Sequence, residues 1–200
     1  MSEIGKQIKG VVKMNDNSRK LEEITTRIEP VFEGKIISLQ IEHVELPNGQ
    51  TSTREVVKHP GAVAVLALRH GKMLAVEQYR KAMSRTLVEI PAGKLDPGEE
   101  PIDAAARELE EETGFRTDTL TYLHAFYTSP GFADEIIHLY ATDRLVEGEV
   151  KPDEDEFLEL LELTLEEAKQ MIALGRIRDA KTIMAVYAWE RYEREGSFAL

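Results

Sequence analysis

The sequence predicts a mixed α/β (α+β) fold in which a mixed β-sheet lies between helices, with a small β-hairpin domain at the N-terminus. Two observations support this. Short apolar or alternating segments typical of strands occur on both sides of one central amphipathic segment, and a helical pair follows near the C-terminus. The chain of 200 residues suits one compact domain with a small addition, and its 42% hydrophobic residues are enough for a core.

The N-terminal part is predicted to contain a hairpin that cannot be stable by itself. Apolar side chains alternate in a first strand, an Asn-Gly pair forms the turn, and the chain returns in a second strand: residues 35–46, 48–49 and 51–58. Residues 1–30 are polar, and we expect irregular structure there. We therefore expect an N-terminal β domain, residues 1–58, that forms a dimer, followed by a main domain, residues 59–200.

The main domain is predicted to combine strands with three helices. The strands are expected at 62–68, 72–78, 86–90, 120–128, 136–142 and 157–163, and residues 93–98 are expected as a loop. The helices are expected at 101–113, from 164 to about 175, and at 180–195. Pro101 stands at a favoured first helical position and Gly114 just past the helix end, while Thr164 and Glu167 have the spacing of a capping box.

Composition excludes several classes of function. The chain has no cysteine, so it cannot use disulfides, a thiolate nucleophile or a cysteine-bound metal. Its formal net charge of −12 argues against nucleic-acid binding, which needs a basic face. The charged N-terminus does not resemble a secretion signal, and no apolar run approaches the length of a membrane span. We therefore expect a cytoplasmic protein that acts on a small molecule and binds no membrane.

The first predicted helix carries an unusual group of carboxylates. Successive helical residues are about 100° apart, so Glu108, Glu111 and Glu112 share one face, while Glu110 points away into solvent. The helix dipole opposes negative charge in these last two turns, and Glu108 and Glu112 repel each other. The sequence therefore predicts a counter-charge at this face. The expected core-facing stripe beside it consists of Ile102, Ala105, Ala106 and Leu109.

A divalent cation is the expected counter-charge. Hard cations such as Mg²⁺ prefer carboxylate and carbonyl oxygens and often complete their coordination with substrate phosphates. Zn²⁺ is disfavoured because the chain has no Cys and its 5 His are scattered. We therefore expect Mg²⁺ as the cofactor, with Mn²⁺ able to substitute. The alternative is an ordinary solvated acidic helix.

The residues around this helix belong to a longer pattern. A Gly is followed after five residues by Glu, and after seven more by a cluster of Arg, Glu, an aliphatic residue, two Glu and Gly: Gly93, Glu99, Arg107, Glu108, Leu109, Glu111, Glu112 and Gly114, with Phe115 where an aliphatic residue is usual. This segment resembles the signature of the Nudix hydrolases. The resemblance implies that Glu108, Glu111 and Glu112 bind metal together with the carbonyl of Ala92. It also implies that Glu99 and Arg107 bridge loop and helix and hold the ligands in place.

A second feature selects a subfamily. Pro130 lies sixteen residues after Gly114, a spacing that resembles the bacterial ADP-ribose pyrophosphatases of the Nudix superfamily. The resemblance implies a set of substrate-binding residues, of which the arginines suit phosphate: Phe32, Arg54, Arg80, Leu95, Phe132 and Glu135. Taken singly, Arg54 could equally be a surface charge, Phe32 a packing residue and Pro130 part of an ordinary turn.

The resemblance implies Mg²⁺-dependent hydrolysis of ADP-ribose to AMP and ribose 5-phosphate, by attack of water on the adenosyl phosphorus. The base that activates this water is expected in the acidic segment 153–156, with Glu156 preferred over Glu154. Similar family members exchange their N-terminal hairpins, so we expect a homodimer whose sites borrow Phe32 and Arg54 from the other chain. Two alternatives remain: hydrolysis of another nucleoside diphosphate derivative, such as a nucleotide sugar or a dinucleoside polyphosphate, or a nucleotide-binding regulator without catalysis.

Overall fold

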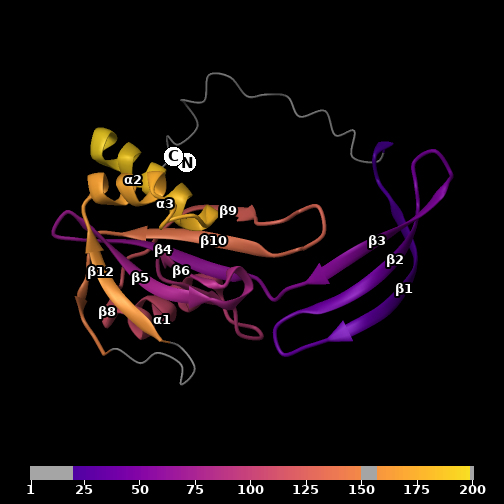
Figure 1. The fold of residues 1–200 in the computed structure, drawn as a ribbon, viewed down its shortest axis with the longest axis horizontal. Helices are drawn as coiled ribbons and strands as arrows, with labels where there is room; N and C mark the ends of the chain where they lie inside the picture. Colours follow the sequence, from indigo (N-terminus) through magenta and orange to yellow (C-terminus); the bar gives the residue numbers. More distant parts are fainter. Residues whose placement is uncertain (1–19, 150–156, 199–200) are drawn as a thin grey trace, which may run out of the picture.

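The structure is a computed structural model that describes residues 20–149 and 157–198 (Figure 1). Two separate sheets dominate it, a three-stranded N-terminal sheet and a seven-stranded main sheet. The strands of the first are β1 (Ile24–Glu33), β2 (Ser38–Glu45) and β3 (Thr51–Lys58). Those of the second are β4 (Ala62–Arg69), β5 (Lys72–Arg80), β6 (Arg85–Glu89), β7 (Ala92–Lys94), β9 (Thr121–Tyr127), β10 (Ile136–Thr142) and β12 (Leu158–Leu163).

The main sheet is mixed and lies between helices, as predicted. Its central order is β12-β5-β4-β10-β9, with β6 paired to β5 and β7 to β4. Strands β4 and β10 run parallel, whereas the pairs β9–β10, β5–β12 and β4–β5 run antiparallel. Helix α1 (Pro101–Thr113) covers one face, and α2 (Leu165–Ala173) and α3 (Ala180–Glu195) cover the other (Figure 1). The remaining elements are the short strands β8 (Phe115–Arg116) and β11 (Val146–Glu147) and the 3₁₀ turn η2 (Lys81–Met83).

Strand β4 is the centre of the core because both of its faces are buried. Ala64 and Leu66 belong to the apolar cluster that includes Trp189 of α3. Val63 and Val65 belong to the cluster on the opposite face, which includes Leu109 of α1. A strand buried on both faces appears in the sequence as a continuous apolar run, which is how β4 was predicted. The double burial fixes α1 against the sheet. None of the helices in the described part of the chain is long and apolar enough to cross a membrane.

The prediction of irregular structure up to residue 30 was wrong for its last part, because residues 24–33 form strand β1. This strand pairs antiparallel with β2, with register irregularities between Thr25 and Arg27 and between Pro30 and Phe32. Two such irregularities and a proline interrupt the period-two pattern by which a strand is recognised. The expected hairpin is therefore a three-stranded sheet. Residues 1–19 lie outside the described residues.

Much of the apolar surface of the N-terminal sheet is not covered by the described chain. Ile24, Ile28, Val31 and Phe32 of β1 are each more than half exposed. Among the described residues of this sheet, Val44 is the one buried hydrophobic side chain. An apolar surface of this kind, next to a well-packed domain, is typical of a region that binds a partner.

Helix α1 packs through a slightly different stripe from the one expected. Ala105 and Leu109 are buried as predicted, whereas Ile102 is 47% exposed and Ala104 is buried instead. Because alanines make the contact, the helix can approach β4 closely. The same rotation buries Glu112, which is 5% exposed. One member of the carboxylate group therefore lies under the helix edge rather than in open solvent.

Candidate active site

Helix α1 holds the predicted carboxylates because both of its ends are well defined. Pro101 occupies the first turn, where its missing N–H costs no helical hydrogen bond. Gly114 ends the helix in the left-handed conformation, with φ of 71°, and donates its N–H to the carbonyl of Glu110. Glycine adopts this conformation without strain. The last two turns therefore present the three predicted metal ligands on a fixed backbone.

Arg107 links these carboxylates to the loop before the helix. Its Nε and Nη2 donate to the two oxygens of Glu99, both at 2.9 Å, and Nη2 also donates to the carbonyl of Lys94 at 3.2 Å. Its Nη1 donates to Glu108 at 2.8 Å and to Glu111 at 2.9 Å. The hydrogen bond from Arg107 lowers the pKa of Glu99. One guanidinium thus joins loop and helix, the contact expected between Glu99 and Arg107.

The chain approaches the carboxylates most closely at Gly93. Residues 92–94, where the start of a loop was expected, form strand β7 and pair with β4. A Cβ atom on Gly93 would lie 2.0 Å from the carboxyl carbon of Glu108, so a side chain at this position would displace the carboxylate. The N–H of Ala92 donates to Glu112 at 3.1 Å. The backbone of residues 92–93 and the carboxylates of α1 therefore share one small space.

A second charged cluster centres on Glu89, which no sequence pattern singled out. Glu89 ends β6 and is 2% exposed. Arg80 donates from Nε and Nη2 to its two oxygens, each at 2.8 Å, and Lys181 donates to one of them. Burial alone would raise the pKa of Glu89, but the hydrogen bond from Arg80 and the charges of Lys181 and Arg80 lower it to about 2. Glu89 is therefore ionised at neutral pH.

Arg80 connects this cluster to the first one. The hydrogen bond with Glu89 is the main cause of its raised pKa, and the charges of Glu112 and Asp179 also contribute. Since Glu112 belongs to α1, Arg80 is coupled to the carboxylate face through charge. A single carboxylate inside the apolar segment 86–90 was the signal that could have revealed Glu89, because a charge in a buried strand is almost never left unpaired.

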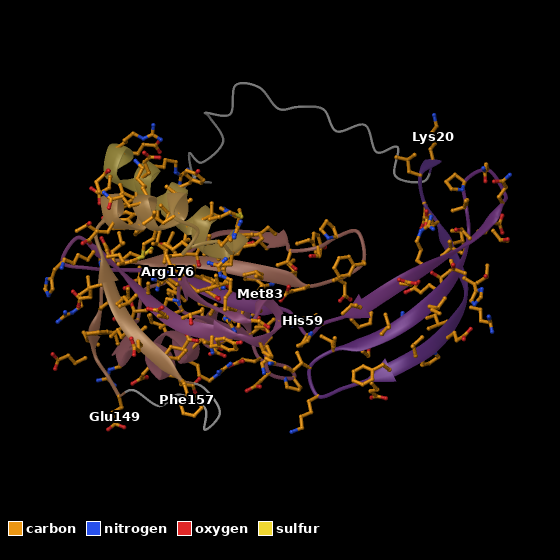
Figure 2. All side chains as sticks on the ribbon, in the orientation of Figure 1. Lys20, His59, Met83, Glu149, Phe157 and Arg176 are labelled. Atoms are coloured by element: carbon orange, nitrogen blue, oxygen red, sulfur yellow. The ribbon has the colours of Figure 1, made fainter. Side chains whose placement is uncertain are left out.

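Loop 129–135, which contains Pro130, is joined to the end of β3. The N–H of Val57 donates to the carbonyl of Phe132 at 2.8 Å, and the N–H of Asp134 donates to the carbonyl of Val57 at 3.1 Å. Asp134 also accepts the N–H of His59 at 2.8 Å. Figure 2 shows His59 at the junction between the N-terminal sheet and the main domain. The loop is therefore fixed at this junction.

The same junction determines the surroundings of Glu135. Its carboxylate accepts a hydrogen bond from Thr128 at 2.5 Å and lies 3.6 Å from Nε2 of His59. The N–H of Gly61 donates to Nδ1 of His59 at 3.1 Å, which orients the ring so that its Nε2 lies on the side of Glu135. Phe132, by contrast, is 58% exposed.

Among the other predicted residues, Phe32 and Arg54 lie apart from α1, whereas Leu95 lies beside it. Phe32 and Arg54 belong to β1 and β3, on the opposite side of the molecule from α1 (Figure 1). Arg54 donates to the two oxygens of Glu23 at 2.8 and 2.5 Å. Leu95 packs against the apolar cluster beneath α1. Two predicted residues lie outside the described residues: Glu154 and Glu156.

Comparison with known proteins identifies the family. A model of the NUDIX domain matches residues 57–186. The chain belongs to the Nudix family. It is 54% identical over 171 residues to the ADP-ribose pyrophosphatase of Bacillus subtilis (strain 168). This alignment covers 84% of this chain and 92% of that protein. It is 55% identical over 168 residues to the methanol dehydrogenase activator of Bacillus methanolicus, covering 82% and 91%. A crystal structure of an ADP compounds hydrolase shares the fold, with a TM-score of 0.77 over 88% of this chain and 96% of that one, at 20% identity.

This Nudix hydrolase is an enzyme of a family that generally uses a divalent metal, and its residues fit such an ion. The predicted metal ligands around Gly93 all offer oxygen atoms, from the carbonyl of Ala92 and the carboxylates of α1, and hard divalent cations prefer oxygen ligands. In residues 20–149 and 157–198, no three His, Asp or Glu side chains form a ready-made metal-holding group. Arg107 instead bridges Glu108 and Glu111. A cation bound at this face would take over part of that bridge.

Proposed function

We propose that this Nudix hydrolase cleaves ADP-ribose to AMP and ribose 5-phosphate, with Mg²⁺ as its cofactor and Mn²⁺ able to replace it. The observation that carries the proposal is the carboxylate face joined by Arg107, in a chain 54% identical over 84% of its length to a protein named ADP-ribose pyrophosphatase. The face supplies the site for phosphate chemistry, and the relative indicates the substrate.

Hydrolysis of a phosphoanhydride needs neutralised phosphate charge, in-line alignment and an activated water. The proposed ligands of Mg²⁺ are the carbonyl of Ala92 and the carboxylates of Glu108, Glu111 and Glu112. When held there, Mg²⁺ would neutralise phosphate charge and lower the pKa of a bound water. Glu99 and Arg107 keep those carboxylates oriented. Because Arg107 already donates to Glu108 and Glu111, these two side chains would have to rotate or share their oxygens to hold an ion.

The remaining proposed residues bind the substrate and move the proton. Arg80 binds the diphosphate through its guanidinium, Glu135 binds the terminal ribose or the adenine, and Leu95 and Phe132 provide apolar contact. Glu156, with Glu154 as the alternative, accepts the proton of the water that attacks the adenosyl phosphorus. Glu156→Gln with near-wild-type turnover and intact metal binding would show that the base is another residue, and a large loss of turnover in Glu154→Gln would then assign it to Glu154.

We further propose a homodimer in which residues 1–58 form a domain exchanged between subunits and residues 59–200 form the catalytic domain. The apolar side chains exposed on β1 support an interface there. Phe32 and Arg54 lie on this N-terminal sheet. If the sheet is exchanged between subunits, each site receives both residues from the other chain. Light scattering should give twice the mass of the chain, and a fully active monomer would contradict the proposal. Mixing Arg54→Ala and Glu112→Gln subunits should restore activity, because one site of the mixed dimer is then complete.

A substrate panel tests the activity itself. The chain is supplied with Mg²⁺ or Mn²⁺ and with ADP-ribose, nucleotide sugars or dinucleoside polyphosphates, and nucleotide release is followed by chromatography. We expect the highest kcat/KM for ADP-ribose and, in ¹⁸O-labelled water, label in AMP. A higher kcat/KM for a nucleotide sugar would favour that substrate class. Absence of hydrolysis despite metal and nucleotide binding would favour a regulator.

A second candidate function is activation of a methanol dehydrogenase. The observation that favours it is 55% identity over 82% of the chain to a protein named methanol dehydrogenase activator. The rate of methanol oxidation by such a dehydrogenase, with and without the chain, tests it. The Glu112→Gln variant then decides whether activation requires the carboxylate face.

The proposal includes a cytoplasmic location and excludes nucleic acid and membranes as partners. The charge of −12 opposes binding to polyanions such as nucleic acid. Fractionation of cells with an antibody against the chain tests the location, and recovery with the membrane fraction would contradict it.

A further inference from the structure

Arg80 is oriented by Glu89 in a way that leaves part of its guanidinium available. Its Nε and Nη2 donate to the two carboxylate oxygens, each at 2.8 Å. A guanidinium has five N–H donors. The two bonds to Glu89 use Nε and Nη2 and leave the N–H groups of Nη1 to other partners. The side chain is 36% exposed. Its Nη1 edge can therefore meet an anion while the other edge stays on Glu89.

Glu89 has a second cation to which the mechanism above gives no role. Lys181 donates to Glu89 and, at 3.0 Å, to Asp179. The side chains of Glu89 and Lys181 are 3% and 11% exposed, so their attraction is only weakly screened by water and salt. Lys181 is thus the more buried partner of Glu89, and Arg80 is the more exposed one.

The first turn of α3 fixes Lys181 in this place. Asp179 caps the helix and accepts hydrogen bonds from the N–H and the hydroxyl of Thr182, each at 3.0 Å. The same hydroxyl accepts the N–H of Ile90 at 3.0 Å. The start of α3 is therefore bonded to the end of β6 twice, once through the side chain of Glu89 and once through the backbone of Ile90.

The electrostatic consequence falls on Arg80. A buried carboxylate with a single cation would hold that cation strongly, because leaving the charge uncompensated is costly. With Lys181 present, Glu89 remains paired even when Arg80 also bonds to another anion. We propose that Lys181 is a positioning residue for the substrate diphosphate: it balances Glu89, so that Arg80 keeps its direction and still presents its charge and its Nη1 edge to a phosphate. This inference rests on the proposed function, since it requires a diphosphate at the carboxylate face.

The test removes the charge of Lys181 at nearly constant length. In Lys181→Met, Arg80 alone balances Glu89, so we expect KM for ADP-ribose to rise about tenfold, the lower end of the effect of losing an outer partner of a binding residue, while kcat changes little. Lys181→Arg should restore KM. Mn²⁺ affinity, measured by electron paramagnetic resonance, should be unchanged in both variants. A matched control is Lys169→Met, which removes a cation paired with Glu190 at 2.7 Å and should leave KM unchanged.

A probe without a nucleoside separates this inference from the choice of substrate. Binding of imidodiphosphate in the presence of Mg²⁺ is measured by calorimetry, and Lys181→Met should weaken it about tenfold, as it weakens ADP-ribose. If the wild type does not hydrolyse ADP-ribose but Lys181→Met weakens imidodiphosphate binding, the substrate assignment fails and the inference stands. If Lys181→Met binds imidodiphosphate as tightly as the wild type does, the inference is overturned.

Two further variants distinguish positioning from a structural role. Lys181→Gln keeps a hydrogen bond to Glu89 without the charge and carries the same test if Lys181→Met does not fold. In an Arg80→Lys background the fork on Glu89 is lost, so the effect of removing the Lys181 charge on imidodiphosphate binding should fall below about twofold. An undiminished effect would show that Lys181 does not act through Arg80, and would also overturn the inference.

Discussion

Arg107 and Arg80 each bind a carboxylate through hydrogen bonds, but Glu111 beside Arg107 and Glu89 beside Arg80 differ in burial. Glu111, which Arg107 binds, has a side chain that is 36% exposed. Glu89, which Arg80 binds, has a side chain that is 3% exposed, and Lys181 is its second cation. Near solvent, water or an ion can replace a lost hydrogen bond, whereas in the interior a broken pair leaves an uncompensated charge. Glu111 is therefore suited to exchange partners, and Glu89 is suited to keep one arrangement.

The largest expected effect comes from removing the charge of a proposed metal ligand. Glu112→Gln keeps the shape of the side chain but not its charge, so kcat/KM should fall by more than about 10²-fold, because even outer partners of metal ligands cost roughly 10–100-fold. Mn²⁺ binding and steady-state kinetics measure this. Glu110→Gln, on the same helix but off the carboxylate face, is the control, and equal losses in both variants would contradict the assignment.

Arg107→Lys should cost less, roughly 10–100-fold in kcat/KM. A lysine cannot donate two parallel hydrogen bonds to Glu99 and also bridge Glu108 and Glu111. We expect the loss in kcat together with weaker Mn²⁺ binding, since both depend on carboxylate orientation. Arg69→Lys, at a surface pair with Glu162, is the control. Wild-type kinetics in Arg107→Lys would show that a positive charge at position 107 is sufficient and that the hydrogen bonds of the guanidinium are not needed.

Gly93→Ala should weaken metal binding about tenfold with little effect on the fold. The added Cβ would lie 2.0 Å from the carboxyl carbon of Glu108, which is the far end of a flexible side chain and can move. The cost should therefore appear in Mn²⁺ affinity and not in Tm. A large drop in Tm with unchanged affinity would mean that the close approach serves packing.

The last prediction concerns stability rather than activity, and it follows Glu89 as a function of pH. The pKa of Glu89 is lowered from 4.5 to about 2, so its ionised form stabilises the fold above pH 4.5, and this contribution is lost as the pH falls from 4.5 towards 2. The loss amounts to roughly 3 kcal/mol at most. Urea unfolding should show a shallower decline over this range for Glu89→Gln than for the wild type. Glu166→Gln, at a side chain that is 79% exposed, should keep the wild-type slope.

Local signals were sufficient to predict most of the fold. The bounds of β3, β10, α1 and α3 agree with the predicted ranges at both ends. Caps and turn residues explain this, since Pro101, Gly114 and Asn48 act on the chain immediately beside them. Strand β1 was not predicted, because its pairing with β2 is irregular and depends on a partner strand rather than on its own pattern.

The charged clusters also differ in how far they could be predicted from the sequence. The contacts of Arg107 join residues that are at most 13 positions apart, so one loop and one helix bring them together. The pair of Glu89 and Lys181 spans 92 positions, and only the packing of α3 against the end of β6 unites it. The second cation of a buried carboxylate therefore could not be predicted from the sequence.

Strand β3 connects the N-terminal sheet to the loop around Phe132. It pairs with β2 along its length and ends in two backbone hydrogen bonds between Val57 and the loop. The position of the loop is therefore tied to the position of the sheet. A partner that binds the N-terminal sheet would also act on the placement of Phe132 and Asp134 through these two hydrogen bonds.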